Sequence, residues 1–175
     1  MKSVPRVFRG SIMGRTALVA NNLLAGIIAG AAGTTALNAV TYGDMVLRGR
    51  PASEAPTKVA AIFADKAGVD LTSGDHSKDG QQVAESRQQG LGSLIGYVAG
   101  VGVGAALAPL LGKLPTPLLG ITLGIAAMAA SDAPIAALGV SNPAEWSASD
   151  WVSDLIPHLV YGLVTAAVYE ALRDH

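Results

Sequence analysis

Four long stretches of this sequence hold almost no charged side chains, and they limit what the chain can fold into. No Asp, Glu, Lys or Arg occurs among the 28 residues from Thr16 to Gly43 or the 25 residues from Gln88 to Gly112. The stretch from Leu114 to Val140 is interrupted only by Asp132, and a fourth runs from Leu155 to Tyr169. A helix needs about 20 mostly apolar residues to cross a hydrocarbon core about 30 Å thick. We therefore predict an all-α integral membrane four-helix bundle.

The predicted spans lie near residues 17–42, 91–111, 117–139 and 152–172, within a single membrane domain of 175 residues. Composition agrees with this prediction, because only 14% of the residues are charged against about 25% in soluble domains. The first stretch is longer than the 7–15 apolar residues of a signal peptide. We therefore expect it to be retained as a helix.

A polar segment, 43–90, separates the first two predicted spans. After Pro56 it carries Val59, Ile62 and Phe63 at helical spacing, which predicts a short amphipathic helix. Such a helix would lie on the bilayer surface or cap the bundle. The stretch from Asp70 to Gln89 is rich in polar and turn-forming residues, so we predict turns there.

Several classes of function are disfavoured by composition. The net charge of −1 gives no reason to expect nucleic acid as a partner. The absence of Cys excludes disulfides, thiolate zinc sites and iron–sulfur clusters. Asp70, Asp75, His76 and Asp79 share a polar stretch without regular ligand spacing. We expect no metal and no cofactor.

Catalysis by a serine nucleophile would need a hydroxyl beside a histidine. Ser131 is the one plausible partner for His158, and no glycine pattern of a nucleophile elbow surrounds it. We therefore predict that the protein is not an enzyme.

The orientation in the membrane follows from basic residues near the first span, which usually dominates. Basic residues divide equally between the two sides, but four of the six on one side precede the first span: Lys2, Arg6, Arg9 and Arg15. This favours both termini in the cytoplasm. Ser141, Asn142 and Pro143 are typical of a helix start, and Trp146 and Trp151 are candidate anchors at the membrane interface.

Small residues recur four apart in every predicted span, which allows helix backbones to approach closely. This spacing favours a compact bundle, a homo-oligomer, or both. The glycines concerned are Gly26 and Gly30 in the first span, Gly96, Gly100 and Gly104 in the second, Gly120 and Gly124 in the third, and Gly162 in the fourth.

Polar residues inside the spans fall at a similar predicted depth. At a rise of 1.5 Å per residue, Asp132, His158, Asn38 and Tyr97 each lie about 6–10 Å from the same membrane face. Asp154, His158, Tyr161 and Thr165 share one helix face, and so do Thr34, Asn38 and Thr41, because their spacings follow the helical period. We expect both faces to point into the bundle, since lipid offers no hydrogen-bond partners.

An ionisable side chain inside a membrane costs at least about 2.5–3.5 kcal/mol and is usually paired or functional. Our hypothesis is that Asp132 and His158 form a hydrogen-bonded pair with Asn38 and Tyr161 as neighbours. The functional interpretation is a proton relay or a small-solute site. The alternative is polar contacts that fix helix register, each about 0.6 kcal/mol.

Two short motifs resemble a known family. Gly30-Ala31-Ala32-Gly33-Thr34, followed by Asn38, and His158-Leu159-Val160-Tyr161-Gly162 are similar to motifs of the small YagU-like inner-membrane proteins of bacteria. The resemblance covers about a fifth of the chain. It implies a multi-span protein of the bacterial cytoplasmic membrane without an established activity, and it implies no catalytic or binding residue.

Two functions follow as expectations. The first is a structural or accessory membrane protein, as a subunit of a larger complex or as a homo-oligomer, with the lipid bilayer around it. The alternative is a small transporter or proton-conducting protein that uses Asp132 and His158.

Overall fold

The computed structural model describes residues 7–72, 74–75 and 77–173, and side chains from residue 18 onward. Within these ranges the chain forms helices and no strands. The basic residues that favour cytoplasmic termini fall outside this description, Lys2 and Arg6 by position and Arg9 and Arg15 by side chain. The elements are α1 (Val7–Arg48), α2 (Ala55–Lys66), α3 (Lys78–Leu111), α4 (Thr116–Ala137), a 3₁₀ helix (Pro143–Glu145) and α5 (Ala148–Arg173).

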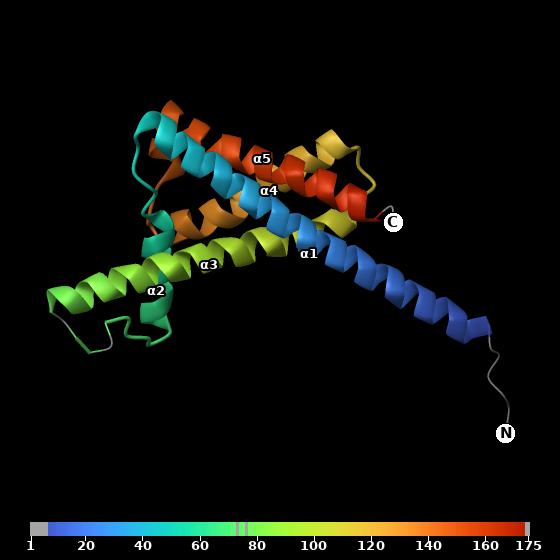
Figure 1. Cartoon of the computed structure of the whole chain (residues 1–175), viewed down its shortest axis with the longest axis horizontal. Helices are drawn as coiled ribbons and strands as arrows, with labels where there is room; N and C mark the ends of the chain where they lie inside the picture. Colours follow the sequence, from blue (N-terminus) through green and yellow to red (C-terminus); the bar gives the residue numbers. More distant parts are fainter. Residues whose placement is uncertain (1–6, 73, 76, 174–175) are drawn as a thin grey trace, which may run out of the picture.

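Four of these helices are long and apolar enough to cross a membrane: α1 from Leu18 onward, α3, α4 and α5. They form one bundle in which α1 packs against α3 and α5, and α4 packs against α5 (Figure 1). The end of α1, the end of α4 and the start of α5 meet at one end of the bundle. The first turns of α1 and of α3 project beyond the bundle in opposite directions (Figure 1).

The polar segment 43–90 is more helical than the sequence suggested. α1 continues to Arg48, and α3 already begins at Lys78, so the prediction of turns up to Gln89 is wrong. Ser77 explains the early start, because its hydroxyl accepts a hydrogen bond from the backbone N–H of Gly80. Such a cap satisfies one of the N–H groups that a helix start leaves without a partner.

The short helix predicted after Pro56 is α2, and it lies across α3 (Figure 1). Its buried residues are Val59, Ala60 and Ala64, whereas Phe63 is 43% exposed. The buried face is therefore rotated relative to the predicted one, because α2 packs against α3 through small residues. At the start of α2, the carboxylate of Glu54 pairs with Lys58 at 2.9 Å. This hydrogen bond and the lysine charge lower the pKa of Glu54.

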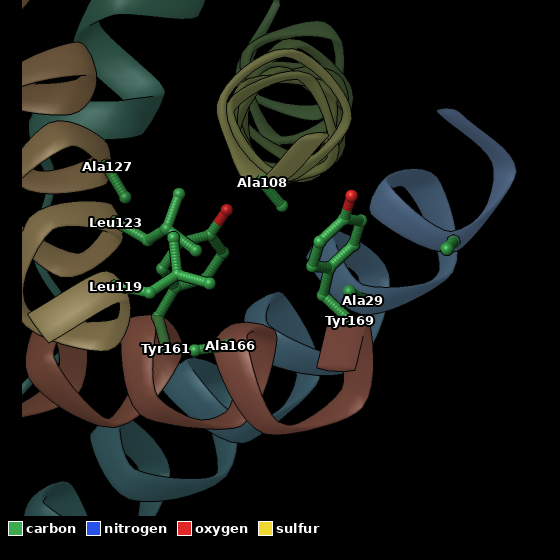
Figure 2. Packing of buried hydrophobic residues seen from close by; sticks show 9 residues of the cluster. Ala29, Ala108, Leu119, Leu123, Ala127, Tyr161, Ala166 and Tyr169 are labelled. Atoms are coloured by element: carbon green, nitrogen blue, oxygen red, sulfur yellow. The ribbon is translucent and has the colours of Figure 1, made fainter. Parts of the chain in front are cut away.

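The core of the bundle consists of small residues around two tyrosines. Tyr161 lies beside Leu119 and Leu123, whereas Tyr169 lies toward Ala29 and Ala108 (Figure 2). Tyr161 and Leu123 are 0% exposed, and Tyr169 is 2% exposed. Alanines at the contacts let the helices approach closely and leave the space between them to the two aromatic rings.

Glycines lie at the close contact between α1 and α3 and at the close contact between α4 and α5. A Cβ atom on Gly26 would meet the carbonyl oxygen of Gly104 at 2.8 Å, and one on Gly30 would meet that of Gly100 at 2.9 Å. In the contact between α4 and α5, a Cβ on Gly124 would lie 2.7 Å from the carbonyl oxygen of His158. Gly120 and Gly162 belong to this second contact as well. Gly96 differs from the other predicted packing glycines, because nothing lies within 4 Å of its Cβ position.

Candidate functional site

Three ionisable side chains and one hydroxyl gather between the end of α4 and the start of α5. We call Ser131, Asp132, Asp154 and His158 the acid–histidine cluster. α4 supplies the first two residues and α5 the last two. His158 is buried at 9% exposure, and the other three are half-buried. All four lie in helices long and apolar enough to span a membrane, where ionisable groups are rare and usually paired or functional.

Ser131 links the two helices of this cluster. Its hydroxyl donates to the backbone carbonyl of Met128 at 2.8 Å and lies 3.2 Å from Oδ1 of Asp132. The hydroxyl oxygen of Ser131 also lies 3.4 Å from Nε2 of His158. The hydroxyl can therefore donate toward Asp132 or toward His158 after a small rotation about its C–O bond.

The other ring nitrogen of His158 faces its own helix. Nδ1 lies 2.8 Å from the backbone carbonyl of Asp154 and 3.4 Å from its Oδ1. Because a carbonyl oxygen can only accept, Nδ1 carries a proton and donates. The neutral ring then presents the lone pair of Nε2 to Ser131, and the protonated ring presents an N–H instead.

Asp154 is the fourth member of the cluster, and one of its carboxylate oxygens receives no hydrogen bond. Oδ2 of Asp154 is buried and has no hydrogen-bond partner in the described part of the chain. Asp132 lies near enough to Asp154 and His158 to interact electrostatically with both. A proton on the carboxyl group of Asp132 would supply the donor that Oδ2 lacks, because a protonated carboxyl gains an O–H.

The cluster differs from the predicted pair in its connections. No direct Asp132–His158 hydrogen bond is formed, and Ser131 stands between the two side chains. Sequence reasoning placed Asp154 on the same helix face as His158 but did not pair it with Asp132. The adjacency of Ser131 and Asp132 was the available signal for a bridging hydroxyl.

A second polar group lies one helical turn further along α5, where α1, α3 and α5 meet. We call Gly33, Thr34, Gly100, Tyr161 and Thr165 the tyrosine crossing. The hydroxyl of Tyr161 donates to the carbonyl of Gly100 at 2.6 Å. The hydroxyls of Thr34 and Thr165 donate to carbonyls of their own helices at 2.8 Å and 2.7 Å. Every hydroxyl of the tyrosine crossing therefore has a backbone acceptor.

The remaining residues of the predicted polar layer lie outside both groups. Tyr97 is 41% exposed on α3 and belongs to neither group. Asn38 is half-buried on α1 and takes no part in the hydrogen bonds of the two groups. Spacing alone could not show this, because depth along a helix says nothing about which neighbour a face meets.

Polar side chains also gather at the end of the bundle near the acid–histidine cluster. Arg48 at the end of α1 donates to Ser149 at 2.9 Å, donates to Ser153, and pairs with Asp44. The guanidinium of Arg50 pairs with Asp44 at 2.5 Å. Ser153 directly precedes Asp154, so this network lies beside the cluster at the start of α5.

The two tryptophans lie at the same end. Their rings pack edge to face with centroids 5.1 Å apart. The indole N–H of Trp146 donates to Ser141 at 2.8 Å, and Trp151 is 41% exposed. The segment before them is a short 3₁₀ helix that starts at Pro143 and is capped by Asn142. The predicted helix start at this position is therefore confirmed.

The open hollows of the surface lie elsewhere. Two of about 450 and 430 Å³ lie between α2, α3 and the segment that joins them, and neither includes a residue of the cluster or the crossing. Among the described residues, no three His, Asp or Glu side chains are arranged to hold a metal ion. The chemistry that the acid–histidine cluster can perform with its own groups is the binding and transfer of a proton.

Comparisons with known proteins add no assignment, because no family model, curated protein or solved structure matches this chain.

Proposed function

We propose that the protein handles protons inside the bacterial cytoplasmic membrane, as a small proton-conducting or proton-coupled transport protein. The bridged arrangement Asp132–Ser131–His158–Asp154 supports this proposal most directly. The carboxyl and imidazole groups of this series can donate in one protonation state and accept in the other, and the hydroxyl of Ser131 can donate and accept at once. A proton can therefore move between two helices through short rotations, without any helix moving.

The charges around His158 favour an exchangeable proton. α5 presents Asp154 and α4 presents Asp132. On α1, which also packs against α5, the charged side chains near this end are Asp44 and Arg48, and they pair with each other. Residues 88–111 of α3 contain no charged side chain. Two carboxylates and a neutral imidazole together carry a charge of −2, and an apolar surrounding disfavours a net charge. The cluster therefore becomes neutral when these three groups hold two added protons.

The second candidate is the accessory or homo-oligomeric role expected from the glycines. All of these glycines except Gly96 lie at contacts within the chain, so they supply little reason for a partner. What favours this role is the exposed face of α3, where Leu94 is 64% and Val98 is 73% exposed one helical turn apart. It predicts a discrete oligomer in several detergents, and a monomer in all of them would contradict it.

Membership among the YagU-like proteins, a bacterial membrane and cytoplasmic termini remain parts of this proposal. The lipid bilayer is the partner that the apolar outer surfaces of the four long helices require. No cofactor, metal or nucleic acid enters the proposed reaction.

Proton flux into liposomes tests the proposed function. Purified protein, Asp132→Asn and Asp65→Asn are compared under the same pH gradient with a pH-sensitive dye inside the vesicles. Asp65 lies on α2 and is exposed, so its variant controls for the loss of any carboxylate. We expect the native protein and Asp65→Asn to collapse the gradient faster than empty liposomes, and Asp132→Asn to match empty liposomes. Native protein that never exceeds empty liposomes would refute proton conduction.

A further inference from the structure

Exposure along the inner face of α5 falls to zero within two helical turns. The side chain of Asp154 is 23% exposed and that of His158 is 11% exposed. The next two residues on this face, Tyr161 and Thr165, are 0% exposed. The acid–histidine cluster is therefore reached from the end of the bundle where α5 begins, and Tyr161 is the first fully covered group beyond it.

Tyr161 occupies a slot that two glycines leave open. A Cβ atom on Gly33 would lie 2.9 Å from Cδ2 of the tyrosine ring, and one on Gly100 would lie 3.4 Å from Cε2. The ring thus fills the space between α1 and α3, and its hydroxyl is fixed to the carbonyl of Gly100 at 2.6 Å. A side chain at either glycine would occupy the space of the ring.

The interior stays closed beyond this ring. Leu123 and Ala166 are 0% exposed, and Tyr169 is 2% exposed. The hydroxyl of Thr165 donates to the carbonyl of Tyr161 rather than toward the cluster. On the inner face of α5, the first polar group beyond Tyr161 is therefore not directed toward His158.

From this geometry we infer that the acid–histidine cluster exchanges protons with one side of the membrane, through the end next to Ser153, and that Tyr161 is the gate to the other side. The inference rests on the proposed function and specifies how it is controlled. The gate opens when the ring leaves its slot and gives up the hydrogen bond to Gly100. Tyr161 acts by position, and it transfers no proton itself.

Access can be measured directly, because the chain has no Cys and a single introduced thiol can be labelled without background. Ser131→Cys places a thiol in the cluster, and Thr165→Cys places one beyond the gate. Ala144→Cys marks the exposed connection between α4 and α5. A charged thiol reagent that cannot cross lipid is added to one side of sealed vesicles at a time.

We expect Ser131→Cys to react from the same side as Ala144→Cys and at least tenfold more slowly from the other side. Thr165→Cys should react from neither side while the protein is folded, and fully after denaturation. Equal reaction of Ser131→Cys from both sides, or reaction from neither side, would overturn one-sided access.

The gate is tested by adding Tyr161→Phe, which keeps the ring and removes the hydrogen bond to Gly100. Interhelical hydrogen bonds in membrane proteins are worth about 0.6–1.7 kcal/mol, so the open state should gain about threefold to twentyfold. Labelling of Ser131→Cys from the closed side and the proton flux of the chain without Cys should both rise by this factor. Tyr97→Phe, which alters an exposed tyrosine, should change neither. Unchanged labelling with Tyr161→Phe would refute the gate.

The two sets of results separate the two proposals. If Asp132→Asn leaves proton flux unaltered, the proposed function fails whatever the labelling shows. If Asp132→Asn abolishes flux but Tyr161→Phe changes neither labelling nor flux, the gate fails and the proposed function stands. If Tyr161→Phe raises proton flux, and adding Asp132→Asn to it abolishes that flux, both proposals are supported.

Discussion

The acid–histidine cluster and the tyrosine crossing share the inner face of α5, one helical turn apart. They differ in how the hydrogen bonds of their polar side chains are satisfied. In the crossing, each hydroxyl donates to a backbone carbonyl, and Tyr161 and Thr165 are fully buried. In the cluster, Ser131 and His158 also reach backbone carbonyls at 2.8 Å, but both make further contacts to side chains at 3.2–3.4 Å, and Oδ2 of Asp154 has no donor. A backbone carbonyl does not change its protonation state, whereas a carboxyl or imidazole group has a protonated and a deprotonated form. Polar residues in a membrane helix therefore serve structure where backbone acceptors satisfy all their donors, and are suited to chemistry where titratable side chains lie within reach as well.

The largest expected effect on stability lies at the tyrosine crossing. A Cβ atom on Gly33 would collide with the hydroxyl of Thr165 and would lie 2.8 Å from the carbonyl oxygen of Tyr161. Because backbone cannot move away as a flexible side chain can, α1 and α5 would have to separate. We expect Gly33→Ala to lower the free energy of unfolding by about 1–3 kcal/mol, measured by denaturant titration in mixed micelles.

Gly43→Ala on the same helix is the matched control, since nothing lies within 4 Å of its Cβ position. It should change the free energy of unfolding by no more than about 0.5 kcal/mol. Equal losses for the two variants would show that α1 and α5 are not in close contact at the crossing.

A smaller loss is expected for Tyr161→Phe. The variant keeps the buried ring and removes the hydrogen bond to Gly100, so the free energy of unfolding should fall by about 0.6–1.7 kcal/mol. Tyr97→Phe, at an exposed position on α3, should leave it unchanged. A Tyr161→Phe chain as stable as the native one would mean that the crossing does not depend on its hydrogen bond.

The long helices could be predicted because a run of about 20 residues without charge is visible in the sequence, whichever helices pack beside it. The sequence did not predict the start of α3, since Lys78 to Gln89 are polar and their helix depends on the cap from Ser77. The predicted site residues Asp132, His158 and Tyr161 do lie on inner helix faces. Their partners were not predictable, because the contact of Asp132 with Asp154 depends on how α4 slides along α5.

The same limit applies to Gly33. It lies outside the four-residue spacing of Gly26 and Gly30, so the sequence did not single it out as a packing glycine. Its importance comes from Tyr161 and Thr165 on another helix. Residues whose role lies in a contact between distant segments leave no local pattern, whereas helix length and polarity do.

A still smaller effect on stability is expected for the exposed ion pair of Glu54 and Lys58 at the start of α2. Unlike the cluster and the crossing, this pair is open to solvent. The hydrogen bond and charge of Lys58 lower the pKa of Glu54 in the folded chain. The pair therefore stabilises the fold above the ordinary pKa of Glu, and this contribution is lost as the pH falls through the lowered value. Glu54→Gln should be slightly less stable than the native chain at pH 7 and equal to it in strong acid, as thermal unfolding across pH would show. A difference that persists in acid would mean that the charge of Glu54 is not the cause.

The smallest change in stability is expected where the change in function is largest. In Asp132→Asn the amide offers an N–H donor to Oδ2 of Asp154, as a protonated carboxyl would, and it removes an ionisable group from the helix interior. We expect the free energy of unfolding to stay within about 0.5 kcal/mol of the native value, although proton flux is lost. Asp132→Ala gives the contrast, because it removes the only side chain proposed to donate to Oδ2 of Asp154 once protonated, and an unsatisfied buried group costs about 1–3 kcal/mol. If Asp132→Asn were as destabilised as Asp132→Ala, the cluster would depend on a charged Asp132 for its structure, and the distinction from the tyrosine crossing would be lost.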